Sequence, residues 1–192
     1  MARRCRSPGP GTIAVVSAAL DRLVPASDAG PLEAVAVGEL RQRRNVLQHT
    51  EQTLSYLRRL VQGRLDIVLD ERHRRAEGAA SRDLRTLVDD LPKILSEHIS
   101  GSGRGAIPDV TLPEGDLDDF LDELDRIVGA DRLGSLGECT DTEVAAVVDA
   151  LSDLERQVSH YRRELHGAID SLQEEIVRRY KSGEASVDAL LP

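Results

Sequence analysis

Two stretches of the sequence repeat one pattern of polar residues about a hundred positions apart. Both follow E-x3-S-x2-R-x3-[Q/H]-x3-D and share four of the five residue types. The first copy consists of Glu51, Ser55, Arg58, Gln62 and Asp66, and the second of Glu155, Ser159, Arg162, His166 and Asp170. One copy alone is ordinary for the solvated flank of a coiled coil, where such residues form salt bridges. Repetition at unchanged spacing favours a functional origin.

The residue types in this pattern suit a guanine nucleotide as ligand. An arginine guanidinium binds phosphate oxygens in a fork or stacks on a flat base. A carboxylate accepts two parallel hydrogen bonds from the N1–H and N2–H2 edge of guanine, a pair of donors that adenine lacks. Ser and Gln add adaptable donors and acceptors. On antiparallel helices the two copies would be related by an approximate twofold axis, which favours a ligand with twofold symmetry of its own.

Each copy lies beside the apolar seam of a long amphipathic helix. Apolar residues that recur every seven positions, or in alternating steps of three and four, are typical of coiled coils. The first seam contains Leu40, Leu47, Leu54, Val61 and Val68, with Leu57 and Leu65 beside them, and the second contains Val144, Val147, Leu151, Leu154, Val158, Tyr161, Leu165, Ala168 and Leu172. Because a helix turns by about 100° per residue, the five positions of each copy fall within an arc of roughly 80° next to the seam.

The two long helices are expected over about 33–77 and about 141–182. A glycine follows each of them as a stop signal, and Thr140 with Glu143 forms a capping box at the start of the second. At about 1.5 Å per residue, each helix would extend over roughly 60 Å.

The segment between the long helices predicts a short helical connector. It contains two amphipathic stretches, over about 82–99 and about 116–129, and Pro92 is expected to kink or divide the first. Their apolar residues are Leu84, Leu87, Val88, Leu91, Ile94, Leu95 and Ile99 in the first, and Leu117, Phe120, Leu121, Leu124, Ile127 and Val128 in the second. This length brings the second long helix back along the first. The sequence therefore predicts an all-α fold, a long antiparallel coiled-coil helical hairpin with a short helical connector; a parallel pairing between two chains is the alternative.

Composition agrees with this fold class. The chain has 192 residues, of which 31% are charged, with no Trp, one Phe and three Tyr. Such a composition favours long amphipathic helices over a sandwich or a barrel. Residues 1–30 are rich in Gly, Pro, Ala and Ser and are expected to form a disordered tail, in which residues 15–24 could make a short helix. Residues 31–192 are expected to form a single helical domain.

Charge and cysteine content narrow the functional classes. A net charge of −9 argues against a DNA-binding surface and fits a partner that is itself basic. No apolar run approaches the length of a membrane span, so we expect a cytoplasmic protein without membrane contact. Cys5 and Cys139 are the only cysteines, one expected in the tail and the other in a loop, so neither a structural disulfide nor a metal site is expected.

No group of residues in the sequence indicates an enzyme. The segment VSHYRREL around His160 superficially resembles the phosphoacceptor helix of a histidine kinase, but the chain lacks a Gly-rich ATP-binding region and room for a kinase domain. The five histidines lack the spacing of metal ligands, and no catalytic triad stands out. The main alternative to a ligand-binding protein is therefore a purely structural coiled coil that serves as an interaction scaffold.

The two copies resemble the repeated signature of the RsiG family, actinobacterial anti-sigma factors that bind cyclic di-GMP and hold the sporulation sigma factor WhiG. In that family the signature reads E-x3-S-x2-R-x3-Q-x3-D. The first copy matches it at all five positions, and the second has His166 in place of the Gln. The resemblance implies a regulator of transcription that carries a dimer of cyclic di-GMP on its coiled coil. In the loaded state it would grip a WhiG-like sigma factor, without catalytic residues, metal or direct DNA contact.

With this ligand, the arginines would contact guanine faces or phosphates, and the aspartates would read guanine edges. The resemblance thus assigns ligand contacts to Arg58, Arg162, Asp66 and Asp170, and the rest of the site to Glu51, Ser55, Gln62, Glu155, Ser159 and His166. An imidazole lacks the paired donor and acceptor of an amide, so the contact of His166 is expected to differ or to depend on pH.

An acidic segment in the connector suits a sigma factor as partner. Asp109 to Asp125 contains eight acidic residues and no basic one. Sigma factors present basic surfaces for promoter DNA and core polymerase, and an acidic connector could occupy such a surface. A solvated acidic loop is equally compatible with the sequence.

Overall fold

Every element in the described part of the chain is helical. The computed structural model describes residues 18, 20–22, 31–79, 84–96 and 116–184. The elements are, in chain order, η1 (Leu32–Ala34), α2 (Val37–Ala76), α3 (Leu84–Ser96), α4 (Asp116–Val128), α5 (Ala130–Gly134), η2 (Leu136–Glu138) and α6 (Asp141–Ser182). The predicted all-α fold is confirmed for these residues.

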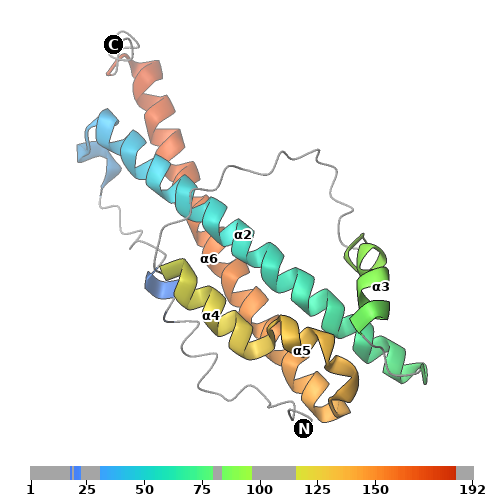
Figure 1. Ribbon diagram of the computed structural model, residues 1–192. Helices are drawn as coiled ribbons and strands as arrows, with labels where there is room; N and C mark the ends of the chain where they lie inside the picture. The colour runs from blue at the N-terminus through green and yellow to red at the C-terminus, as the bar shows by residue number, and fades with distance from the viewer. Residues whose placement is uncertain (1–17, 19, 23–30, 80–83, 97–115, 185–192) are drawn as a thin grey trace.

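The two long helices α2 and α6 pack against each other along the molecule, with the N-terminal end of α2 beside the C-terminal end of α6 (Figure 1). Side-chain pairs fix this direction at both ends. Arg44, early in α2, donates to Gln173, late in α6, at 2.8 Å. Arg75, late in α2, donates to Asp141 at the start of α6, also at 2.8 Å. The hairpin is therefore antiparallel and forms within one chain, as predicted, and the parallel alternative is not the arrangement observed.

The apolar seams form the interface between α2 and α6. Most seam residues are completely or almost completely buried, and each buried leucine contributes about 1.5–3 kcal/mol by leaving water. The buried members are Leu40, Leu47, Leu54, Leu57, Val61 and Val68 on α2, and Val144, Val147, Leu151, Leu154, Val158, Leu165 and Leu172 on α6. Leu65, Tyr161 and Ala168 are only partly buried and lie at the margin of this core.

The ends of the long helices follow their capping signals. Thr140 accepts a hydrogen bond from the Glu143 amide at 3.3 Å, and the Glu143 carboxylate accepts from the Thr140 amide at 2.7 Å, which confirms the capping box. Gly78 and Gly183 follow the two helices with φ values of 73° and 78°, a conformation that costs glycine little. The first helix begins at Val37, later than predicted, because η1 and a short extended segment precede it.

The connector packs against the half of the hairpin that contains the end of α2 and the start of α6 (Figure 1). Leu87 of α3 and Leu133 of α5 line one small cavity beside Ile67 of α2, so α3 and α5 come close to each other there. Arg64 of α2 anchors α4, since its guanidinium donates to the Val128 carbonyl at 2.9 Å and lies 2.6 Å from the Asp125 carboxylate. Pro92 does not divide α3, which continues through it as one helix. Val88 was expected on the apolar side of α3 but is 54% exposed.

Two short elements, α5 and η2, were not predicted. They contain five and three residues. Such lengths are too short for an apolar periodicity to develop. Leu136 of η2 is buried in the common core, so this turn is part of the packed structure.

Several sequence-based predictions fall wholly or partly outside the described residues. They include most of the tail 1–30, the linker before α4 and the acidic segment up to residue 115. Within the tail, residues 20–22 are helical, Leu20 is buried, and Asp21 accepts a hydrogen bond from the Tyr161 hydroxyl. Cys139 is disulfide-bonded, which contradicts the expectation of no disulfide, and the other cysteine lies outside the described residues.

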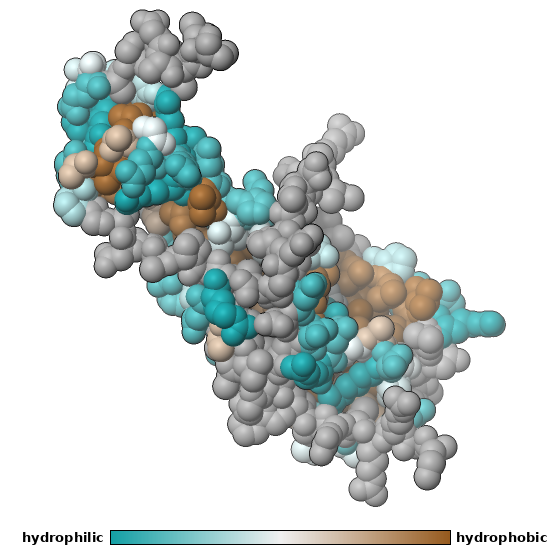
Figure 2. Space-filling model, turned by 60° about the vertical axis from the view of Figure 1, so that its left-hand side comes forward, coloured by the Kyte–Doolittle hydropathy of each residue, from teal (hydrophilic) through white to brown (hydrophobic). Residues whose placement is uncertain are grey.

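Polar and apolar side chains are both exposed on the surface of the described residues (Figure 2). On the face shown in Figure 2, apolar side chains gather in one patch toward each end of the molecule, with polar side chains beside them. Among large apolar residues in the described part of the chain, Val46 and Val88 are exposed. None of the described helices combines the length and the apolar character that a membrane span requires.

Candidate functional site

The repeated polar pattern lies near the middle of the hairpin, on flanks of α2 and α6 that face each other. Equivalent residues of the two copies are 104 positions apart, for example Glu51 and Glu155. Because the helices run antiparallel, the early residues of one copy lie beside the later residues of the other. The structure brings eight of the ten residues together in two groups, each formed by both helices.

The first group, the Glu155 cluster, consists of Glu155 and Ser159 from α6 with Arg58 and Gln62 from α2. The Arg58 Nε donates to the Glu155 Oε1 and to the Ser159 Oγ, both at 2.8 Å. The Gln62 amide donates to the same Glu155 oxygen at 3.3 Å, and the Ser159 hydroxyl does so at 2.9 Å. One carboxylate oxygen thus gathers donors from both helices.

The second group, the Glu51 cluster, repeats this arrangement with the helices exchanged. The Arg162 Nε and Nη2 donate to the Glu51 Oε1 at 3.1 and 2.9 Å, and the Ser55 hydroxyl donates to it at 2.7 Å. The His166 Nε2 lies 3.3 Å from the same oxygen, so the imidazole takes the place that Gln62 has in the other cluster. The two clusters are related by the approximate twofold axis that the sequence predicted.

Electrostatics favour the charged form of both central carboxylates. Partial burial by itself raises the pKa of Glu51, but the hydrogen bonds from Ser55 and Arg162 and the charge of Arg162 outweigh it and lower the pKa below the ordinary value. Glu155 shows the same balance: burial raises its pKa, while Arg58 and Ser159 lower it further than burial raises it. Both clusters therefore contain a carboxylate that stays ionised and holds an arginine of the other helix.

The clusters remain within reach of a ligand from the surface. The arginine side chains are 35% exposed at Arg58 and 23% at Arg162. Within the described part of the chain, the Nη1 and Nη2 atoms of Arg58 have no hydrogen-bond partner, so they are available to phosphate or guanine oxygens. Asp66 is half-buried and Asp170 is exposed, and both lie one helical turn beyond the clusters.

The register of the two clusters is held by an arginine at each end of the hairpin, buried at Arg179 and partly buried at Arg75. Near the end of α6, Arg179 is 7% exposed and donates to the backbone carbonyls of Leu32 and Val35 at 2.5 Å. Near the end of α2, Arg75 donates to the carbonyls of Leu136 and Cys139 at 2.6 and 2.8 Å. We call these the Arg179 clasp and the Arg75 clasp.

The two clasps are a second repeat that the sequence reasoning missed. Arg75 and Arg179 are again 104 positions apart, and so are the carbonyl residues that they bind. Each arginine is oriented by a glutamate four residues earlier, Glu71 at 2.8 Å and Glu175 at 2.6 Å. Comparing the sequence with itself at the offset of the polar pattern would have found the shared E-x2-R-R.

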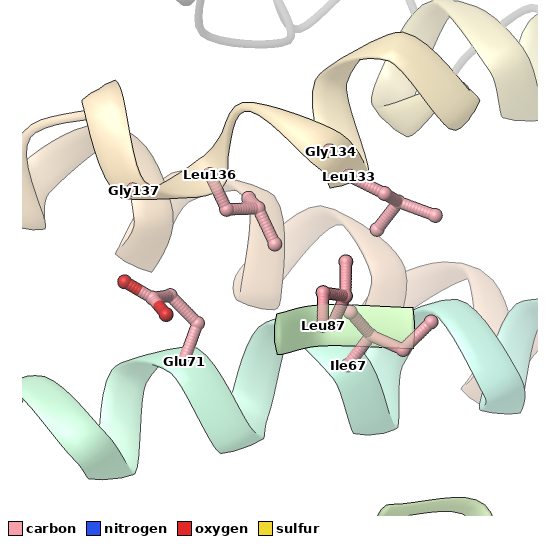
Figure 3. Close-up of a pocket in the computed structure, with 7 residues that line it drawn as sticks. All are labelled: Ile67, Glu71, Leu87, Leu133, Gly134, Leu136 and Gly137. Carbon is pink, nitrogen blue, oxygen red and sulfur yellow. The ribbon is translucent and has the colours of Figure 1, made fainter. Parts of the chain in front are cut away.

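A small cavity beside the Arg75 clasp is not a nucleotide site. Its volume is about 10 Å³, room for no more than one water molecule. Figure 3 shows Glu71 pointing from α2 toward the turn at Leu136 and Gly137, with apolar side chains closing the other side. The cavity is a packing gap between the connector and α2. In the described part of the chain, no group of three or more His, Cys, Asp or Glu residues could hold a metal ion.

Comparison with known protein families gives a match that covers both long helices. Residues 26–95 and 130–192 match the family described as RsiG-like. The matched segments include both copies of the polar pattern and both clasps, and they omit α4. A search of curated proteins found no match.

Proposed function

The protein belongs to the RsiG-like family, a family of anti-sigma regulators, because the match covers well over half of its residues. We propose that it binds cyclic di-GMP and that, in the loaded state, it sequesters a WhiG-like sigma factor of sporulation. The ligand would lie across the two clusters and contact both long helices. The family's role as a regulator agrees with the lack of an indication of enzymatic chemistry in the sequence.

The twofold arrangement of the two clusters carries this proposal. Each cluster contains an arginine, a glutamate, a serine and an amide or imidazole, at equivalent positions of α2 and α6. Cyclic di-GMP consists of two guanosine units in a ring and has twofold symmetry of its own. A symmetric ligand, or a symmetric pair of ligands, would meet the same groups on both helices.

The ligand contacts that we propose follow from the chemistry of each group. The outer guanidinium nitrogens of Arg58 suit phosphate oxygens or the O6 and N7 atoms of guanine. The carboxylates of Asp66 and Asp170 suit the N1–H and N2–H2 donors of guanine, because an ionised carboxylate only accepts hydrogen bonds. Adenine has no such pair of donors, so the site should select guanine.

An acidic surface on α4 supports a basic protein partner such as a sigma factor. Asp118, Asp122 and Asp125 are exposed on this helix, one turn apart. In the described part of the chain, Arg126 is the one basic residue of α4. A complementary charge on the partner would accelerate association, and the effect would weaken as salt is added.

Calorimetric titration with cyclic di-GMP tests the ligand site. Wild type is expected to bind, and the variant Arg58→Ala with Arg162→Ala is expected to lose binding, because both clusters lose their arginine. Arg43→Ala is a matched control, since Arg43 pairs with Glu39 within α2 and lies outside the clusters. Binding that survives the double substitution would contradict the proposed site.

The proposed switch is tested by titrating the protein into a WhiG-like sigma factor with and without cyclic di-GMP. We expect a large gain of affinity with ligand, because the ligand would complete the surface that the sigma factor recognises. Equal affinities in the two titrations would refute the switch.

A structural scaffold is the second candidate, because the glutamates and arginines of the two clusters satisfy one another across the helices without a ligand. Thermal unfolding separates the two functions. A ligand that binds only the folded state raises the melting temperature, so cyclic di-GMP should raise it and GMP should do so less. A scaffold would respond to neither.

A further inference from the structure

A second arginine follows the cluster arginine in both copies of the polar pattern. Arg59 and Arg163 are related by the same offset of 104 residues as Arg58 and Arg162. Both are exposed, and in the described part of the chain neither has a hydrogen-bond or ion-pair partner. Not every exposed arginine of the long helices is repeated: Arg72 corresponds to Ile176, and Arg156 corresponds to Gln52. These two positions therefore carry free positive charge at twofold-related places.

Helix geometry places these arginines along the outer edge of the polar pattern. One residue advances about 100° around the helix, so Arg59 lies about 100° from Arg58 and about 20° beyond Asp66. Arg58 is at the edge next to the seam, where Glu155 holds it. The pattern is thus bordered by a paired arginine on its inner edge and by an unpaired one on its outer edge.

The charge of the pattern shows why an anionic ligand needs the outer arginines. Its ten positions contain four carboxylates and two guanidiniums, which leaves a net charge of −2 when His166 is neutral. Each of the two cluster arginines is also paired with a glutamate. Every cyclic di-GMP brings two phosphodiester groups, each with one negative charge at neutral pH. On the ten positions alone, a dimer with four negative charges would meet a surface of the same sign.

We propose that Arg59 and Arg163 bind the phosphate groups of the nucleotide ligand and neutralise the charge that the ten-residue pattern leaves uncompensated. This assignment rests on the proposed function and extends the site by one residue in each copy. It also separates two roles: the cluster arginines are oriented by glutamates, while the outer arginines act mainly through their charge. An exposed side chain without a partner can turn toward a phosphate at little cost.

The test is a calorimetric titration of cyclic di-GMP into wild type and into the variant Arg59→Ala with Arg163→Ala, at several salt concentrations. Two exposed charge contacts are expected to change the affinity by about tenfold. The variant should also lose less affinity as salt is added, because it makes fewer ion pairs. The Lys pair, Arg59→Lys with Arg163→Lys, should bind within about threefold of wild type, because an ammonium still supplies the charge. Circular dichroism and the urea midpoint should stay unchanged in both variants.

Arg72→Ala is the matched control. Arg72 is exposed on the same helix as Arg59, likewise has no partner among the described residues, and lies outside the pattern, six positions or about 9 Å beyond Asp66 along the helix. It should bind like wild type. The inference would be overturned if the variant Arg59→Ala with Arg163→Ala bound cyclic di-GMP with the affinity and salt dependence of wild type. It would also be overturned if Arg72→Ala lost as much affinity as that variant.

The outcomes distinguish this inference from the proposed function. If wild type fails to bind cyclic di-GMP, the proposed function falls and the inference falls with it. If wild type binds and only the Arg58, Arg162 variant loses affinity, the ligand site stands and the outer arginines are not part of it. A loss confined to sigma-factor binding would also overturn the inference and would place these arginines at the protein interface.

Discussion

The Arg179 clasp should contribute measurably to the stability of the hairpin. We consider Arg179→Met, which keeps most of the aliphatic stem and removes the guanidinium. The substitution deletes two hydrogen bonds from a charged donor to the carbonyls of Leu32 and Val35. Each such bond contributes about 1.5–3 kcal/mol, but water can reach the freed carbonyls in part, so we expect a total loss of about 2–3 kcal/mol. For a chain of this length, that loss lowers the melting temperature by about 5–10 °C.

The assay is equilibrium unfolding in urea, followed by circular dichroism at the helical band, with thermal unfolding in parallel. Arg178→Met is the matched control. Arg178 is the neighbouring residue and also binds Glu175, but it is exposed, and its described partners are two glutamates near the end of the same helix. It should unfold at the wild-type midpoint.

Equal midpoints for Arg179→Met and Arg178→Met would refute the reasoning, because the clasp would then contribute no more than an exposed ion pair. The twofold relation adds a further condition. Arg75→Met removes the equivalent bonds to Leu136 and Cys139, and it should destabilise the protein at least as much. A loss at only one end would mean that the two clasps are not energetically equivalent.

The remaining predictions concern the core, the helix cap, acid stability and the ligand. Leu165→Ala, at a completely buried seam position, should cost about 2.5–5 kcal/mol in urea unfolding. Thr140→Ala removes the cap of α6 and should cost about 1 kcal/mol in the same assay. The folded state lowers the pKa of Glu51 and of Glu155, so their ionised carboxylates stabilise the fold at any pH above their unfolded-state pKa. This stabilisation is lost as the pH falls through the folded-state pKa. Between about pH 5 and about pH 3, the urea midpoint should therefore fall less in a variant with Gln at both positions than in wild type. In calorimetry, His166→Gln should bind cyclic di-GMP at least as tightly as wild type, because the amide would repeat in the Glu51 cluster the donor that Gln62 supplies to the Glu155 cluster; a loss of affinity in His166→Gln would contradict the equivalence of the two positions.

The two clasps and the apolar seams together fix the register of α2 and α6. The Arg179 clasp and the Arg75 clasp hold the first turns before α2 and α6 against the end of the opposite helix. Between them, the apolar seams set how α2 and α6 rotate about their own axes. A slip of the register at either end would move the two polar copies past each other. The clasps therefore contribute to the ligand site that we propose without being part of it.

The sequence alone determined the helices and the residue types of the candidate site. The apolar period defines the seams, the capping box defines the start of α6, and the repeated pattern identifies ten polar positions, because these features depend on residues close to one another along the chain. It did not determine η1, α5 or η2, whose few residues hold their places through contacts with distant parts of the fold.

Only the tertiary structure decided which polar groups meet. Arg58 pairs with Glu155, 97 positions away, and Arg162 pairs with Glu51, 111 positions away. The sequence shows that each copy contains both partners, and within one helix the seven residues from Glu51 to Arg58 put them about two turns apart. The antiparallel register brings each arginine to the glutamate of the other copy instead. That register depends on how two long helices pack over their whole length, which no local pattern encodes.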